Sequence, residues 1–286
     1  MTTVRYGIAE WYGHELTALP ASERQRFAES AQRREQRPCP FTTGDCTKPG
    51  GVCSIRPYIA HGDRIAASVG PNVITCPNRF EQHQMLLGWL AEIVGFGSGA
   101  MMAREVPFMV GPAGAAAGMI DLVVAAEDHG LRWYGLEIQA VYFSGKGMDP
   151  EFAALAVDGS EDAPFPLGHR RPDWRSSSAK RLMPQLQVKV PTLRRWGSKI
   201  AVAVDLPFYD SIGGPSPSPS DDLDSGDVIW LVAEARDGQL LRRHWEVLTL
   251  ELTCDKLLAA APVTRSEFED TLRSKLTPLP IGDPHD

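Results

Sequence analysis

Residues 118–126 (GMIDLVVAA) and 131–139 (LRWYGLEIQ) decide the fold, because they have the pattern of two strands joined by a short turn. Both runs are apolar and rich in β-branched or aromatic residues, and residues 127–130 (EDHG) between them are typical of a turn, so we predict a β-hairpin. Successive side chains of a strand point to opposite faces, and Glu137 and Gln139 are therefore expected on the same face.

An aspartate and a glutamate on neighbouring strands are typical of metal-dependent phosphodiesterases. If Asp121 faces Glu137 across the hairpin, the two carboxylates can hold Mg²⁺ through hard oxygen ligands. A cation held there activates water and stabilises the charge on the leaving oxygen. Gln139 occupies the position where the common nuclease form of this motif has a lysine; its amide cannot act as a general base, but it can orient a water. The alternative is a hairpin whose acids simply lie on a solvated face.

The composition is that of a globular protein, with 43% hydrophobic and 23% charged residues in a chain of 286. No apolar stretch is long enough to span a membrane and the first residues lack a signal-peptide pattern, so we expect a cytoplasmic protein. The net charge of −7 disfavours non-specific coating of nucleic acid. A local basic groove is still compatible with that charge, because binding depends on where the charges lie.

Four of the five cysteines lie in the first third of the chain, with the spacing C-x6-C-x6-C-x22-C. Each is next to turn-forming residues, which allow a chain to wrap around a metal ion. Four thiolates suit zinc or a single iron. Disulfides, disfavoured in the cytoplasm, and unlinked core cysteines are the alternatives. We predict a metal site that organises an N-terminal region, residues 1–78, with the ligands Cys39, Cys46, Cys53 and Cys76.

Hydrophobic periodicity and capping residues predict the remaining elements. We expect helices over residues 20–36, 79–95, 179–196 and 264–275, and strands over 105–110, 199–206, 228–233 and 244–252. Residues 144–178 have the composition of a long irregular loop, and residues 211–227 that of a flexible one. The order helix, strand, hairpin, helix, strand then makes residues 79–286 one α/β domain with the hairpin at its centre.

Basic residues are concentrated between residues 170 and 199, where Asp173 is the only acid among them. In an acidic protein, such a run is a candidate surface for tracking DNA phosphates, and the alternative is a solvated basic helix. The residues concerned are Arg170, Arg171, Arg175, Lys180, Arg181 and Lys189.

Several strings, taken together, resemble the NotI family of restriction endonucleases, a branch of the PD-(D/E)XK nuclease superfamily. The similarity runs in order through the first two thirds of the chain, which makes it more specific than any single motif. The strings are residues 9–14 (AEWYGH), 39–41 (CPF), 51–53 (GVC), 76–79 (CPNR) and 134–139 (YGLEIQ), with a looser similarity at 179–181 (AKR), Gln185 and Lys189.

The resemblance implies a PD-(D/E)XK core of the α/β (α+β) class, a mixed sheet flanked by helices, preceded by a subdomain in which the four cysteines bind iron. It also implies that Asp121, Glu137 and Gln139 form the active site. The expected activity is that of a type II restriction endonuclease, Mg²⁺-dependent hydrolysis at a specific duplex DNA sequence. A symmetric DNA target favours a homodimer. The alternatives are a nicking or modification-dependent nuclease and a DNA-binding protein of the same fold that no longer cleaves.

Overall fold

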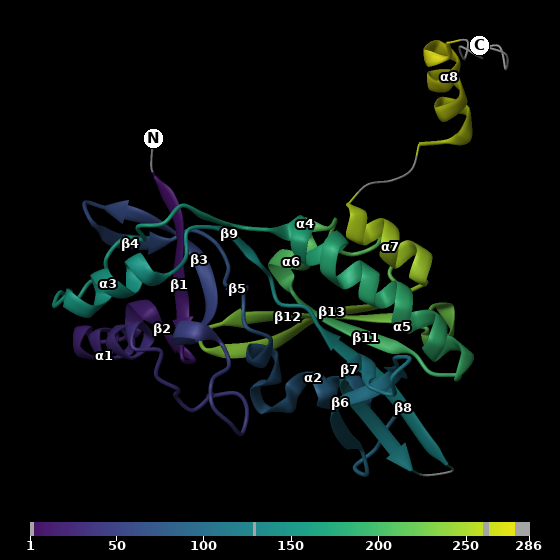
Figure 1. The fold of residues 1–286 in the computed structure, drawn as a ribbon, viewed down its shortest axis with the longest axis horizontal. Coiled ribbons are helices and arrows are strands. Elements are labelled where there is room, and N and C mark those ends of the chain that lie inside the picture. Colours follow the sequence, from purple (N-terminus) through teal and green to yellow (C-terminus); the bar gives the residue numbers. More distant parts are fainter. Residues whose placement is uncertain (1–2, 128–129, 260–262, 278–286) are drawn as a thin grey trace.

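A computed structural model describes residues 3–127, 130–259 and 263–277, and its main body is a mixed six-stranded sheet with helices on both faces (Figure 1). The expected mixed sheet flanked by helices is thus confirmed. In spatial order the strands are β13 (Gln239–Leu248), β12 (Val228–Arg236), β11 (Ile200–Asp205), β8 (Leu131–Ile138), β7 (Ala116–Glu127) and β6 (Met101–Val110).

The predicted hairpin is β7 and β8, which pair antiparallel; Asp128 and His129 of its turn lie outside the described residues. β11 lies next to β8 and runs parallel to it, and β12 is parallel to β11. All six residues of β11 are buried, as expected for a parallel strand covered on both faces. The predicted order of helix, strand, hairpin, helix and strand is present along the chain as α2, β6, β7 with β8, α5 and β11.

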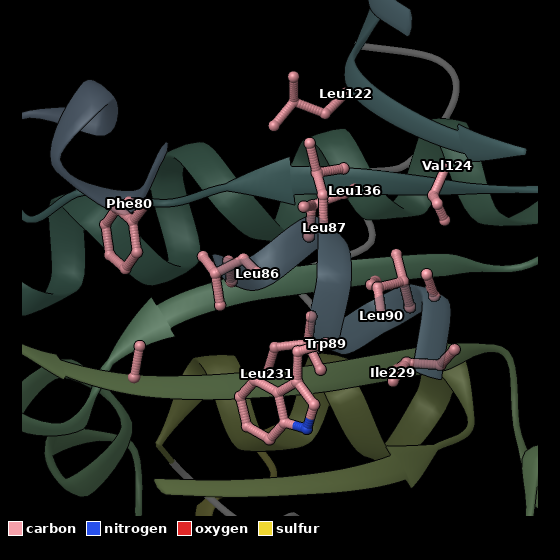
Figure 2. Close-up of a cluster of buried hydrophobic side chains, with 14 of the residues drawn as sticks. Phe80, Leu86, Leu87, Trp89, Leu90, Leu122, Val124, Leu136, Ile229 and Leu231 are labelled. Carbon is pink, nitrogen blue, oxygen red and sulfur yellow. The ribbon is translucent and has the colours of Figure 1, made fainter. Parts of the chain in front are cut away.

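One face of the sheet is covered by the 3₁₀ segment η3 (Pro77–Gln84) and by α2 (Met85–Ile93). Their apolar side chains, among them Phe80, Leu86 and Leu90, pack against the strands (Figure 2). The continuous helix predicted over residues 79–95 is wrong, because the backbone leaves the helical region at Gln82. The physical reason is that the Gln82 amide bonds to the backbone of the distant hairpin between β12 and β13.

The opposite face carries a second layer of helices. Leu186, Val190 and Leu193 of this layer are buried over the β11 and β12 side chains. The layer consists of α4 (Trp174–Ser177), the π-helical turn η4 (Ser178–Leu182), α5 (Met183–Arg195), α6 (Leu206–Ser211) and α7 (Leu250–Leu258).

The N-terminal region forms a separate antiparallel sheet, packed against α1 (Ala21–Gln32) and α3 (Asp149–Val157). Trp11, Phe27 and Phe152 form the centre of its core, with the Trp11 and Phe152 rings stacked 5.6 Å apart. Its strands are β1 (Val4–Trp11), β2 (His14–Glu15), β3 (Val52–His61), β4 (Arg64–Ser68) and β5 (Val73–Ile74).

Two further expectations are corrected by the structure. The supposed irregular loop 144–178 contains α3, the short strands β9 (Phe143–Gly145) and β10 (Arg170–Pro172), and α4, because Phe152 and Leu155 of α3 are buried against the N-terminal sheet. The strand expected to reach residue 252 ends at Leu248, since Thr249 caps α7 by accepting a hydrogen bond from the Leu252 N–H. The terminal helix is confirmed as α8 (Arg265–Lys275).

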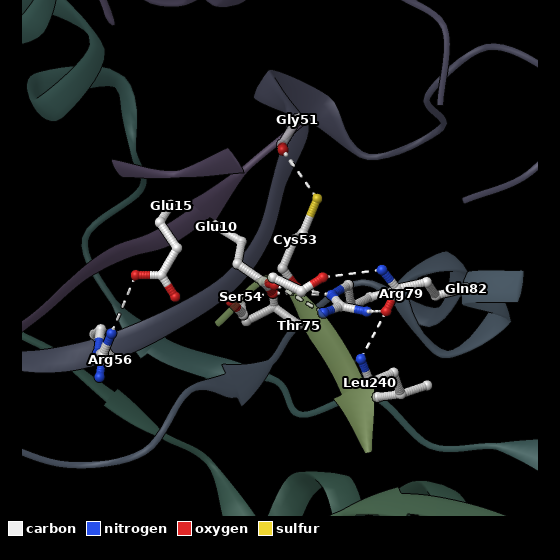
Figure 3. Close-up of polar contacts among 11 residues, drawn as sticks. Glu10, Glu15, Gly51, Cys53, Ser54, Arg56, Thr75, Arg79, Gln82 and Leu240 are labelled. Carbon is white, nitrogen blue, oxygen red and sulfur yellow. Dashed lines mark hydrogen bonds and ion pairs between the residues drawn. The ribbon is translucent and has the colours of Figure 1, made fainter. Parts of the chain in front are cut away.

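A buried ion pair connects the N-terminal sheet to the main body (Figure 3). The Glu10 carboxylate accepts hydrogen bonds from Ser54 and from Arg79, and both members of the Glu10–Arg79 pair are fully buried. Arg79 also donates to the Gln82 Oε1 atom, 2.8 Å away, and Gln82 in turn bonds to the backbone of Leu240.

In the part of the chain that the structure describes, no helix has the length and apolar content to cross a bilayer.

Asp205 makes a second connection between the two sheets. It lies at the end of β11, and its carboxyl accepts hydrogen bonds from the backbone N–H of Ile74 in β5 (2.6 Å) and of Phe208 in α6 (3.0 Å). Complete burial raises the pKa of Asp205 from 3.8 to about 7.

This pKa predicts a dependence of stability on pH. The folded state binds the Asp205 proton more tightly than the unfolded chain, so the stability gained from it is complete below about pH 3.8 and is lost as the pH rises through about 7. Relative to Asp205→Asn, which does not titrate, the free energy of unfolding of the wild type should fall by up to about 4 kcal/mol across this range. Urea unfolding at several pH values measures this; a difference that does not change with pH would contradict it.

Candidate active site

The hairpin brings Asp121 and Glu137 together, as predicted. Leu122 pairs with Leu136, so the two acids are the next residues along the paired strands. The Asp121 N–H lies 3.4 Å from the Glu137 Oε1 atom, and the Ile138 N–H donates to the Asp121 Oδ2 atom at 3.1 Å. The carboxylates are thus held against each other's backbone at the end of the hairpin, where β8 borders β11.

Glu137 is almost completely buried, with 2% of its surface exposed, whereas Asp121 is half-buried. Burial and, to a smaller extent, the nearby charge of Asp121 raise the pKa of Glu137, which lies at about 7. The Lys189 ammonium opposes both effects from 2.5 Å. The site therefore combines two like charges and one opposite charge, largely out of water.

Gly135 allows the strands to pack closely on the face that carries Glu137. A Cβ atom at residue 135 would lie 3.1 Å from a methyl group of Ile120 and 3.3 Å from a side-chain carbon of Ile200. These contacts are tighter than ordinary van der Waals distances, so a side chain here would require Ile120 and Ile200 to shift by a few tenths of an ångström. This close packing explains why residue 135, two residues before Glu137, is a glycine.

Lys189 was assigned to the DNA surface by sequence reasoning, and the structure places it elsewhere. It is buried on the face of α5 that covers the sheet, with its ammonium between Glu137 and the Gln185 Oε1 atom, 3.3 Å away. The only sequence signal that Lys189 belongs to the site was the family similarity at Gln185 and Lys189. These two residues lie one helical turn apart. Their contact with the hairpin depends on how α5 packs.

Gln139 continues the parallel ladder, because its N–H donates to the Ala203 carbonyl at 3.0 Å. Its side chain is buried, and its amide nitrogen donates to the neighbouring Ala140 carbonyl at 2.5 Å. Within the described ranges, no hydrogen bond connects Gln139 to Asp121 or Glu137. The structure thus brings the two acids and Lys189 together, with Gln139 beside them.

The predicted basic surface divides into buried and exposed members. Arg170 is buried and paired with Glu151, which neutralises its charge, so we leave it out of the DNA surface. Four residues are exposed on β10, α4 and η4, the elements that lead into α5: Arg171, Arg175, Lys180 and Arg181. The Arg181 guanidinium lies 3.7 Å from the centre of the half-exposed Tyr142 ring.

The four N-terminal cysteines come from two places in the fold. Cys39 and Cys46 lie on the two arms of a loop that is closed by hydrogen bonds from their own N–H groups. Cys53 is the second residue of β3 and Cys76 follows β5, and the Cys76 N–H donates to the Cys53 carbonyl at 3.2 Å. Burial raises the pKa of Cys46, Cys53 and Cys76, and in each case the charge of a neighbouring cysteine raises it further.

Neither the acid pair nor the four cysteines form a complete coordination sphere for a metal ion. Over the ranges that the structure describes, no three histidine, cysteine or acidic side chains are close enough together to hold a metal ion. The acid pair nevertheless fits Mg²⁺, which commonly uses one or two carboxylates and fills its other positions with water and phosphate. The thiols fit zinc or iron by donor type, and binding would release their protons.

The electrostatic contact between the acids is directly measurable. In Asp121→Asn, the charge that disfavours ionisation of Glu137 is removed, so the pKa of Glu137 should fall below its value of about 7. An NMR titration of carboxyl-labelled glutamate measures this pKa. Asp255→Asn removes an exposed acid from α7 and serves as the control, in which the pKa of Glu137 should stay unchanged. Equal titration curves in all three proteins would contradict the geometry.

The chain was compared with known proteins. A family model described as restriction endonuclease NotI matches residues 23–244. The match includes the four cysteines, the hairpin with its two acids, and Lys189. A search of curated proteins finds no match. Because the family model covers most of the chain, this protein belongs to the NotI restriction endonuclease family.

Proposed function

We propose that the protein is a type II restriction endonuclease that hydrolyses phosphodiester bonds at a specific sequence of duplex DNA and requires Mg²⁺. The observation that carries the proposal is the contact between Asp121 and Glu137 at the end of the central hairpin, in a chain of a restriction endonuclease family. Two carboxylates on adjacent strands of a mixed sheet with helices on both faces also agree with a PD-(D/E)XK core.

Asp121 and Glu137 would hold the cation between them. When bound, Mg²⁺ supplies a Lewis acid that polarises the phosphate and makes a nearby water more acidic. Asp121, as the more exposed acid, is the side from which a phosphate group reaches the pair. Gln139 lies beside Glu137 and can orient water through its amide once that amide leaves the Ala140 carbonyl.

DNA would approach along the exposed basic residues of β10, α4 and η4. Arg171, Arg175, Lys180 and Arg181 carry four positive charges on the segment that continues into α5, and α5 carries Lys189 to the acid pair. Phosphate contacts of this kind position a protein on the duplex without reading its sequence. Cleavage of both strands of a symmetric site fits a homodimer, in which each subunit supplies one acid pair.

A second candidate function is DNA binding without cleavage. It is favoured by the absence of a lysine at Gln139 and by the hydrogen bond that holds the Gln139 amide to Ala140. This function would also require the basic surface, but it would not require the acid pair.

Incubation of the purified protein with plasmid and Mg²⁺ should produce discrete double-strand fragments. Glu137→Ala should lower the cleavage rate by at least about 100-fold and leave DNA binding unchanged, because the carboxylate holds the cation and does not contact bases. Gel assays of cleavage and of mobility shift measure the two activities. Glu246→Ala, which removes another buried glutamate beside a lysine, is the matched control and should still cut.

Other outcomes of this experiment separate the alternatives. Nicked circles as the only product would indicate a nicking enzyme. Shifted but intact DNA with the wild-type protein would support the non-cleaving DNA-binding protein and refute the proposed activity.

We further propose that Cys39, Cys46, Cys53 and Cys76 bind one structural iron or zinc. The support is that each of Cys46, Cys53 and Cys76 lies within electrostatic range of another of these cysteines, next to the half-buried Lys48. Four thiolate donors are the set that both metals accept.

Metal analysis of the purified protein should find one iron or zinc per chain. Cys53→Ser should lose this metal and unfold at a lower temperature, because a structural metal contributes its binding free energy to folding. Cys254→Ser, a change of the half-buried cysteine in α7, should retain both metal and melting temperature. A metal-free wild-type protein with the same melting temperature as Cys53→Ser would contradict the site.

A further inference from the structure

The ion pair between Lys189 and Glu137 differs from two other buried pairs in the described part of the chain. In the pairs Glu10–Arg79 and Glu151–Arg170, one acid meets one base. At Glu137 a single ammonium pairs with a carboxylate that already has a second carboxylate, Asp121, beside it. One negative charge is therefore left over at a largely buried position, which is the electrostatic condition for binding a further cation.

The position of Lys189 also answers a question raised by Gln139. The strand offers an amide where a positive side chain is common in nucleases, and an amide carries no charge. The charge comes instead from α5, whose Leu186 and Val190 are fixed in the core on either side of Lys189. A lysine head group on a flexible four-carbon stem can move while this backbone stays in place.

The contacts of the Lys189 ammonium indicate the direction in which it can move. Besides the Glu137 Oε2 atom at 2.5 Å, it has a second acceptor, the Gln185 Oε1 atom at 3.3 Å. Gln185 is exposed, whereas Glu137 has 2% of its surface exposed. Lys189 can thus leave the carboxylate toward the surface of the helix layer, where DNA would lie, and still keep a hydrogen bond.

We propose that Lys189 occupies the cation position at Glu137 until a divalent ion replaces it, and that its ammonium then contacts the scissile phosphate as the positive side chain that Gln139 cannot supply. This inference rests on the proposed nuclease function. It makes Lys189 a catalytic residue that also competes with the metal. The two roles predict opposite effects of the same substitution on cation affinity and on cleavage.

Lys189→Met should bind Mg²⁺ at least about tenfold more tightly in the absence of DNA, because the competing charge is gone. It should cleave at least about 100-fold more slowly in single-turnover assays with saturating Mg²⁺, because the positive group at the phosphate is lost. Calorimetric titration with Mg²⁺ alone measures the first effect. Lys256→Met is the matched control, since Lys256 is also a mostly buried lysine beside a buried glutamate, and neither quantity should change.

A merely structural ion pair would weaken Mg²⁺ binding and cleavage together, and that result overturns the inference. Tighter binding with unchanged cleavage would overturn the contact with the phosphate. If Lys189→Met does not fold, Lys189→Gln, which keeps a hydrogen-bond donor without charge, should show the same pair of effects. Lys189→Arg keeps the charge and should recover cleavage with near wild-type Mg²⁺ affinity. A wild-type protein that cuts no DNA refutes the proposed function, while the Mg²⁺ titrations still decide whether Lys189 competes.

Discussion

The placement of Asp121 opposite Glu137, with each carboxylate against the backbone of the other strand, is the constraint on which the rest of the site depends. Two like charges at the end of one hairpin repel each other, and burial of Glu137 makes the repulsion more costly than it would be in water. The fold maintains the contact by fixing both backbones: each acid faces an N–H group of the opposite strand. Lys189 neutralises one of the two negative charges in the described structure, and the other is the charge that favours binding of a further cation.

The sheet topology explains why a helix can supply the positive charge of Lys189. β8 and β11 are parallel, so the chain has to cross over one face of the sheet between them, and α5 lies on this crossover. A side chain on the inner face of α5 necessarily points at the strands it covers, and β8 is one of them. Lys189 is therefore brought to Glu137 by the connection that makes the sheet parallel, although the two residues are far apart in the sequence.

The hairpin and its acid pair could be predicted from the sequence, because both depend on residues close together in the chain and on the two-residue period of a strand. Lys189, Arg170 and Gln82 could not be placed in this way. Lys189 depends on the packing of α5, and Arg170 is buried because Glu151 lies on a helix in a segment that has the composition of a loop. Gln82 interrupts a helical pattern to bond to a strand residue that follows it by more than half the chain. In each case a tertiary contact overrides the local preference.

The cysteine region is connected to the candidate site through tertiary hydrogen bonds. Cys76 immediately precedes η3, whose Arg79 and Gln82 bond to β1 and to the β12–β13 hairpin. Two residues before Cys76, Ile74 donates its N–H to Asp205 at the end of β11, and β11 pairs directly with the strand that carries Glu137. A metal that fixed Cys53 and Cys76 would therefore hold the short segment between β5 and η3, and with it the strand next to Glu137. In this arrangement the cysteine region would contribute to the candidate site by positioning strands.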